Sequence, residues 1–244
     1  MKKTAIVTGA SRGIGAATAA LLARSGWRVA LGCFRHPGPA RDLCGALAAE
    51  GLEAFPFQGD VSSVKEAEGL ARAVLDRWGR IDLLVNNAGI AQQKLFTDIT
   101  EEEWDRMFAV NVKSLYACCR AVVPHMVREH RGSIVNIASI WGEVGASCEV
   151  HYSASKAAVI GFTKALAKEL GPSGVRVNCV SPGVIATDMN AALPPETMAA
   201  LREETPLGTI GSPEEVARAV AWLAGEEASF VTGQVLGVNG GFVI

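Results

Sequence analysis

The chain has 244 residues and a formal net charge of -2, with 23 Lys and Arg residues against 25 Asp and Glu residues. A surface that binds nucleic acid needs a clear excess of positive charge, so this balance argues against nucleic acid as the main partner. The length permits one or two domains and a large hydrophobic core.

Short apolar, β-branched runs alternate with longer helix-like segments along the whole chain. The predicted strands are, in chain order, residues 4–8, 28–33, 54–58, 83–86, 133–138, 176–181 and 235–238. The predicted helices are residues 14–25, 39–50, 64–78, 101–130, 152–170 and 213–225. This alternation is typical of βαβ units, and neither a linker nor a repeat divides it. We predict one α/β domain over residues 1–244, a doubly wound Rossmann fold whose seven-stranded, mostly parallel sheet has the order 3-2-1-4-5-6-7, with helices on both faces.

Three glycines lie where the first predicted strand meets the first predicted helix. Glycines there let the backbone approach a pyrophosphate, which binds the free N–H groups of the helix N-terminus. A merely structural tight turn is the alternative, but the first strand–helix junction favours a nucleotide. The predicted phosphate contacts are Gly9, Ser11, Arg12, Gly13, Ile14 and Gly15.

The second predicted strand ends without the acidic residue that would bind the ribose 2′-OH of NAD. Arg35 follows the strand instead, and Arg12 lies in the glycine loop. Two guanidinium groups suit a 2′-phosphate, although two ordinary surface arginines are the alternative. We therefore predict that the cofactor is NADP(H), preferred over NAD(H).

Tyr152 and Lys156 stand four residues apart at the start of a predicted helix, so they share one helix face. A nearby ammonium lowers the pKa of a phenol, which fits it for acid–base work near neutral pH. Ser139 ends the preceding strand, where its hydroxyl can donate to a substrate carbonyl. Asn111 lies among apolar residues of the fourth helix, either as a satisfied core asparagine or as a residue that bends the helix and holds a water.

These motifs together resemble the short-chain dehydrogenases/reductases. The resemblance runs from Lys3 to the C-terminus and includes Thr8-Gly9-x-x-x-Gly13-x-Gly15, Asn86-Asn87-Ala88-Gly89, Asn111, Ser139, Tyr152-x-x-x-Lys156 and Pro182-Gly183. It implies an oxidoreductase in which Tyr152 is the general acid for carbonyl reduction and Ser139 orients the substrate oxygen. It also implies that Lys156 lowers the tyrosine pKa and holds the nicotinamide ribose, while Asn111 holds a water that relays protons to Lys156. The remaining cofactor contacts that it implies are Asp60 and Val61 at the adenine, Asn87, Ala88 and Gly89 on the adenosine side, and Pro182, Gly183, Ile185 and Thr187 around the nicotinamide.

The nature of the carbonyl substrate is open between several classes. Within the family the chain is most similar to bacterial 3-oxoacyl-[acyl-carrier-protein] reductases, which implies an acyl carrier protein as partner. The segment before Tyr152 departs from theirs, because Trp141, Glu143 and Glu149 suit a cationic or polar substrate better than an acyl chain. This segment is similar to that of reductases of 5-aminopentanone-modified elongation factor P. A sugar, steroid or polyol dehydrogenase and a non-catalytic NADP-binding regulator are further alternatives.

Other features bear on the surroundings of the site. Residues 186–208, with Pro194-Pro195 and a polar helix, predict a substrate lid. The six cysteines form no C-x-x-C pair and the N-terminal apolar run is short, so we expect reduced thiols, no metal, no membrane span and a cytoplasmic protein. The family resemblance implies a homotetramer, for which the apolar end Phe242-Val243-Ile244 would form part of an interface.

Overall fold

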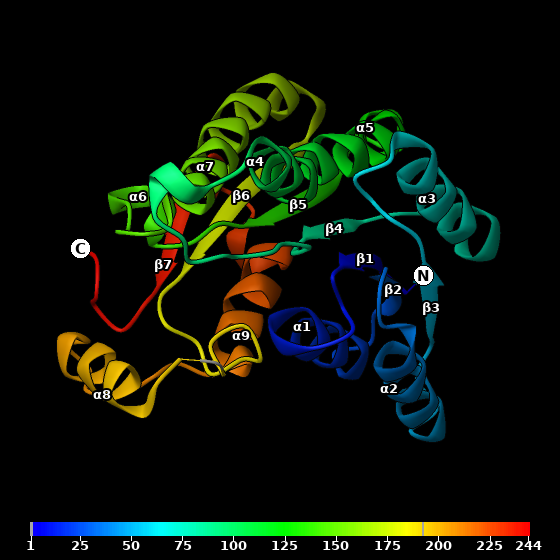
Figure 1. The fold of residues 1–244 in the computed structure, drawn as a ribbon. Coiled ribbons are helices and arrows are strands. Elements are labelled where there is room, and N and C mark those ends of the chain that lie inside the picture. The colour runs from blue at the N-terminus through cyan, green and yellow to red at the C-terminus, as the bar shows by residue number, and fades with distance from the viewer. Residues whose placement is uncertain (1, 192) are drawn as a thin grey trace.

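The computed structural model describes residues 2–191 and 193–244 as one sheet with helices on both faces (Figure 1). The strand order is β3-β2-β1-β4-β5-β6-β7, as predicted, and every neighbouring pair is parallel. The strands are β1 Thr4–Thr8, β2 Arg28–Cys33, β3 Ala54–Gln58, β4 Leu83–Asn86, β5 Gly132–Ile137, β6 Val175–Pro182 and β7 Val235–Val238. The order reverses between β1 and β4, so a crevice opens there at the carboxyl edge of the sheet.

The helices cover the two faces of the sheet in separate groups. They are α1 Gly13–Arg24, α2 Pro37–Ala49, α3 Val64–Trp78, α4 Glu101–Phe108, α5 Ser114–Arg128, α6 Trp141–Val144, α7 Val150–Leu170, α8 Pro195–Glu204 and α9 Pro213–Ala224. Alternate strand residues enter opposite cores: Val7 packs with α1, α2 and α9, whereas Ile6 packs with α3, α5 and α7. Both faces of the five central strands, β1, β2, β4, β5 and β6, are therefore largely buried, which explains their continuous apolar runs.

The fourth predicted helix is not continuous. A π-helical turn, Ala109–Lys113, separates α4 from α5, and Asn111 lies at its centre. Asn111 bonds to groups outside its own helix, and such an insertion into the hydrogen-bond ladder is a recognised cause of helix distortion. The predicted helix at residues 101–130 is wrong in this respect, and it also ends two residues earlier than expected, at Arg128.

Three further features concern the described chain as a whole. All six cysteines, each of them in the described part, are unpaired, and five of the six are buried. Across residues 2–191 and 193–244, the structure contains no helix with the length and apolar character needed to cross a membrane. A group of His, Cys, Asp and Glu side chains suited to a metal ion is likewise absent from these residues.

Candidate active site

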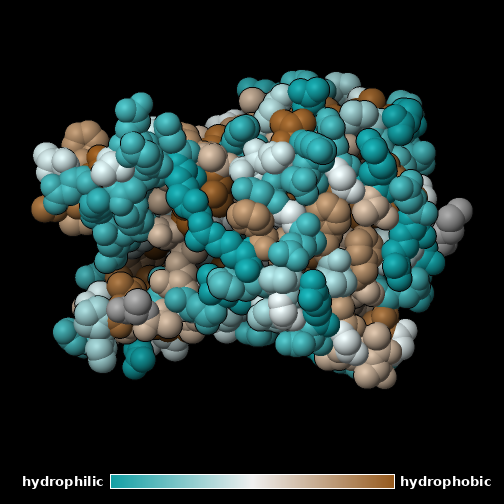
Figure 2. Space-filling view, turned by 45° about the vertical axis from the view of Figure 1, so that its right-hand side comes forward, coloured by the Kyte–Doolittle hydropathy of each residue, from teal (hydrophilic) through white to brown (hydrophobic). Residues whose placement is uncertain are grey.

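Two adjoining cavities open at the carboxyl edge of the sheet. The first, of about 560 Å³, lies over the ends of β1, β2 and the residues after β3. The second, of about 450 Å³, lies over the ends of β5 and β6 and is bounded on its far side by α8. Both are lined by Ile14, Asn87, Gly89, Ile90, Thr187 and Met189, so they meet along a shared border. Figure 2 shows the surface hollowed at its left side, with brown, apolar side chains inside the hollow.

The glycine loop is packed directly on the loop after β4. Gly9 has a φ of +63° and Gly13 a φ of +54°, which side-chain-bearing residues rarely adopt. The Asn87 amide Nδ2 donates to the carbonyl oxygens of Thr8 at 3.0 Å and of Gly9 at 3.1 Å. The Thr8 hydroxyl accepts from the backbone N–H groups of Asn87 at 3.0 Å and Ala88 at 3.1 Å. Two loops far apart in the sequence thus form one rigid cradle at the switch point.

The start of α1 leaves its first N–H groups available. Arg12, the residue at the N-cap, makes no side-chain bond to the first turn. Free N–H groups at a helix N-terminus attract a phosphate. Ser11, Arg12, Gly13 and Ile14 line the first cavity, as predicted for phosphate contacts. Gly15, by contrast, is buried against Asn87 and does not line it, so this glycine serves the packing of the loop.

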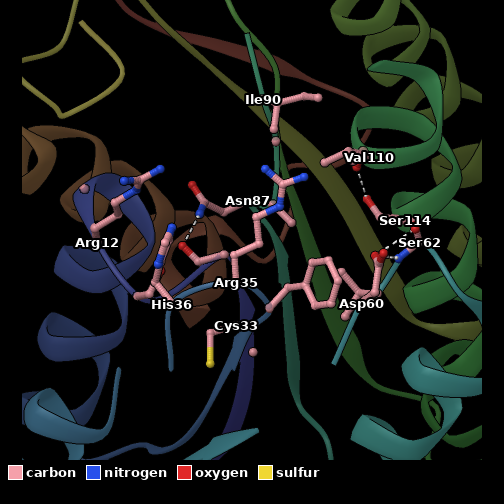
Figure 3. A pocket seen from close by; sticks show the side chains of 18 of the residues that line it. Arg12, Cys33, Arg35, His36, Asp60, Ser62, Asn87, Ile90, Val110 and Ser114 are labelled. Atoms are coloured by element: carbon pink, nitrogen blue, oxygen red, sulfur yellow. Dashed lines mark hydrogen bonds between the residues drawn. The ribbon is translucent and has the colours of Figure 1, made fainter. Parts of the chain in front are cut away.

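Basic side chains from the glycine loop and the end of β2 line the first cavity. Figure 3 shows Arg12 and His36 on one side, Arg35 extending into the middle, and Asp60 on the opposite side. Arg12 also lies 3.6 Å from Asp188 in the lid segment, with both side chains largely exposed. The Asp60 carboxylate is engaged locally, because its Oδ1 accepts from the backbone N–H and the hydroxyl of Ser62. His36 was missed from the sequence, although its place directly after Arg35 could have indicated it.

Tyr152 and Lys156 lie at the border of the second cavity, on α7. The Lys156 Nζ is 5.8 Å from the centre of the Tyr152 ring and donates to the carbonyl oxygen of Ile137 at 2.9 Å. Burial raises the pKa of Tyr152 to about 12, and the Ser139 hydroxyl acts in the opposite direction. Burial likewise lowers the pKa of Lys156 to about 8. Burial therefore dominates both groups in the protein without cofactor, and the lowering of the tyrosine pKa by Lys156 stays a prediction.

Asn111 connects the π-helical turn to two neighbouring segments. Its Oδ1 accepts from the backbone N–H of Ile90 at 2.8 Å, and its Nδ2 donates to the Ile90 carbonyl at 3.0 Å. The same Nδ2 lies 2.9 Å from the hydroxyl of Ser155 on α7. A Cβ placed on Gly89 would lie 3.4 Å from both the Asn111 Oδ1 and the Lys156 Nζ, so Gly89 separates the two. Asn111 is thus a satisfied core asparagine, and its role in holding a water stays a prediction.

Three residues before Tyr152 distinguish this chain from the carrier-protein reductases, and two of the three line the second cavity. Trp141 and Glu149 line it, together with Ser139 and Gln93. Glu143 does not, because its carboxylate accepts from the Ser181 hydroxyl. Pro182, Gly183, Ile185 and Thr187 also line this cavity. Gln92 and Gln93 were missed from the sequence, since nothing in the run after Asn86-Asn87-Ala88-Gly89 indicates that the chain turns back toward α7.

Sequence comparisons with known proteins point to the same class of protein as the arrangement of these residues. A family model described as enoyl-(acyl carrier protein) reductase matches residues 9–243. The chain belongs to the short-chain dehydrogenase/reductase family. It is 39% identical to the 3-oxoacyl-[acyl-carrier-protein] reductase FabG of Staphylococcus epidermidis over 241 residues, which is 99% of each chain. It is 41% identical to the protein of the same name in Thermotoga maritima over 246 residues, covering 99% of this chain and 98% of the relative.

A differently named relative shows similar identity. Nodulation protein G of Azospirillum brasilense is 40% identical over 240 residues, covering 98% of both chains. The resemblance drawn from the motifs is confirmed, and with it an oxidoreductase acting on CH–OH and C=O groups through a nicotinamide cofactor.

Proposed function

We propose that the protein is an NADPH-dependent carbonyl reductase that converts a ketone into a secondary alcohol. The observation that supports this proposal most directly is that Ser139 and Tyr152 line a cavity that adjoins the proposed phosphate-binding loop. A ketone beside this pair would lie next to a nicotinamide whose phosphates bind at the start of α1. The names of the FabG relatives, 3-oxoacyl-[acyl-carrier-protein] reductase, support the same direction and the same class of carbonyl.

The residues around the first cavity fit NADPH. Gly9 and Gly13 hold positive φ angles that keep the backbone close to the cavity, and α1 offers its uncapped N–H groups there. Arg12 and Arg35 supply two guanidinium groups for a 2′-phosphate, and the only acidic residues lining this cavity in the described chain are Asp60 and Asp188. Asp60 is bonded to Ser62, and Asp188 is paired with Arg12. When bound, NADPH would supply the hydride.

The residues of the chain would supply the proton and hold the carbonyl. Because burial raises the pKa of Tyr152 to about 12, its phenol stays protonated at neutral pH and its Oη can donate to the carbonyl oxygen. The Ser139 hydroxyl would donate to the same oxygen as negative charge develops on it. Lys156, fixed by the Ile137 carbonyl, would contact the nicotinamide ribose. The lid at residues 186–208, with α8, would close over the substrate and exclude water.

We further propose that the enzyme works in the cytoplasm as a homotetramer. The strand β7 ends the sheet, and an edge strand offers unpaired backbone groups to a second copy. Phe230, before the start of β7, and Ile244, after its end, have fully exposed side chains, and Trp222 is 43% exposed. Exposed apolar side chains can form part of association surfaces.

The proposal is tested by following NADPH oxidation with an acetoacetyl thioester, a simple methyl ketone, and a panel of sugars, steroids and polyols. We expect oxidation with the ketones, and little reverse reaction with NADP and the polyols. NADPH binding without turnover of any carbonyl compound would favour the non-catalytic regulator. Faster oxidation of a polyol than reduction of every ketone would favour the dehydrogenase alternative.

A further inference from the structure

Glu149 stands at the N-cap of α7 but does not cap it. The short polar side chains of Asp, Asn, Ser and Thr commonly accept a hydrogen bond from the first turn when they stand at this position. The Glu149 side chain makes no such bond. It lines the second cavity instead, and only 9% of the residue is exposed. The stability of the helix therefore does not explain why a carboxylate is buried at this point.

The Glu149 carboxylate also lacks a positive partner in the described chain. Its Oε1 accepts one hydrogen bond, from the Gln93 amide at 3.1 Å, and none of the described Lys, Arg or His residues forms an ion pair with it. Among the described residues, Lys156 is the other charged side chain that lines this cavity, and it donates to the Ile137 carbonyl. Burying a carboxylate without a counter-charge is costly, and burial raises the pKa of Glu149 accordingly. A cation entering the cavity would offset this cost.

The wall around Glu149 is fixed in place. The Gln92 amide donates to Glu103 at 2.7 Å, and its oxygen lies 3.1 Å from the His151 Nε2. These bonds tie the segment that carries Gln93 to both α4 and α7. Trp141 lines the same cavity, and its ring meets that of Phe242 edge-on at 5.5 Å between centroids. A tryptophan face attracts cations more strongly than other aromatic side chains do.

Glu149 directly precedes α7, Tyr152 lies in the first turn of this helix, and both residues line the second cavity. We infer that Glu149 is a specificity-determining residue, and that it selects ketones that carry a positively charged group a few carbons from the carbonyl. This inference rests on the proposed ketone reduction. An ammonium-type group would meet the Glu149 carboxylate and the Trp141 face while the carbonyl lies at Tyr152. A carboxylate at the same position would be repelled.

Three methyl ketones test the charge alone. Each carries, after the same three-methylene spacer, a trimethylammonium, a tert-butyl or a carboxylate group; the quaternary cation cannot cyclise onto the ketone. We expect the wild-type protein to reduce the cationic ketone with the highest kcat/KM and the carboxylate with the lowest. In Glu149→Gln, the ratio of kcat/KM for the cationic over the tert-butyl ketone should fall at least tenfold. Glu143→Gln removes a charge from the same segment but outside the cavity, and should leave this ratio unchanged.

Equilibrium binding of the same ketones, measured by calorimetry, separates the inference from the proposed function. Tighter binding of the cationic ketone that is lost in Glu149→Gln supports the inference even if no ketone is reduced. Turnover of an acetoacetyl thioester with no preference for the cation, in rate or in binding, overturns the inference and leaves the proposed function standing. Equal ratios in wild type and Glu149→Gln overturn it as well.

Discussion

At the scale of single residues, Lys156 is a buried ammonium bonded to a backbone carbonyl. Within the described residues it forms no ion pair. Its depressed pKa means that the folded protein pays for holding the charge, and that this cost disappears as the lysine deprotonates. The residue is thus retained at the expense of stability, as expected for a group that serves the chemistry of the site.

The pH dependence of stability tests whether burial of the Lys156 ammonium destabilises the folded protein. Burial lowers the pKa of Lys156 from 10.5 to about 8, so between these values the unfolded chain binds a proton that the folded chain does not. The contribution of Lys156 to stability therefore rises with pH across that window. Relative to Lys156→Met, the wild-type free energy of unfolding should rise by about 3 kcal/mol between pH 8 and pH 10.5, measured by urea titration. Lys164→Met, an exposed position on the same helix, should show no such change. If the difference in unfolding free energy between wild type and Lys156→Met did not change with pH, Lys156 would not be destabilised by burial as described.

We expect Arg12 and Arg35, which both line the first cavity, to set the preference for NADPH over NADH. Arg12→Ala and Arg35→Ala should each raise the KM for NADPH about tenfold, because each removes a charge-assisted hydrogen bond to the 2′-phosphate worth about 1.5–3 kcal/mol. NADH has no phosphate there, so its KM should change little. Arg41→Ala, on α2 and away from the cavity, is the control. Equal effects on both cofactors would show that the arginines do not contact the 2′-phosphate.

At the scale of elements, the strands could be predicted from the sequence and the helix details could not. The ranges 4–8, 28–33, 54–58, 83–86 and 235–238 match the structure. In the central strands β1, β2 and β4 both faces are buried, so their apolar runs are continuous. The π-helical turn depends on the bonds from Asn111 to Ile90 and Ser155, which lie 21 and 44 residues away in sequence. No local pattern reports such contacts, so the sequence predicted one continuous helix, with a bend at Asn111 only as an alternative.

In the candidate site, too, some features could be predicted from the sequence and others could not. Ser139, Tyr152 and Lys156 could be placed from motif spacing, since the carboxyl ends of parallel strands meet at one edge. Gly15, in contrast, was expected to touch the cofactor and is instead packed inside the loop. That Glu149 leaves its helix uncapped also follows only from the three-dimensional placement of Gln93.

Substitution of Gly15 tests the rigidity of the cradle. A Cβ at position 15 would collide with the Gly9 carbonyl oxygen and lie 2.5 Å from the Asn87 Nδ2. Gly15→Ala should therefore destabilise the protein by about 1–3 kcal/mol and weaken NADPH binding. A Cβ at Gly45 on α2 would meet no other atom within 4 Å, so Gly45→Ala should stabilise the protein by up to about 1 kcal/mol. Equal stabilities of the two variants, by thermal unfolding, would refute the tight packing.

At the scale of the whole molecule, the free edge of the sheet predicts self-association. Sedimentation should give four times the mass of one chain, and Phe230→Asp, which places a charge on a fully exposed apolar side chain beside β7, should shift the protein toward smaller species. A wild-type protein that sediments as a single chain at all concentrations would disprove the proposed tetramer.

The proposed function depends on one predicted proton donor, Tyr152, which lines the second cavity. The most direct test is the single-turnover rate of hydride transfer from NADPH to an acetoacetyl thioester in Tyr152→Phe, with NADPH binding measured in parallel. We expect the rate to fall by about 100-fold or more while NADPH still binds, because the phenolic proton is lost and the ring is kept. A rate equal to that of the wild type would contradict the assignment of this tyrosine as the acid.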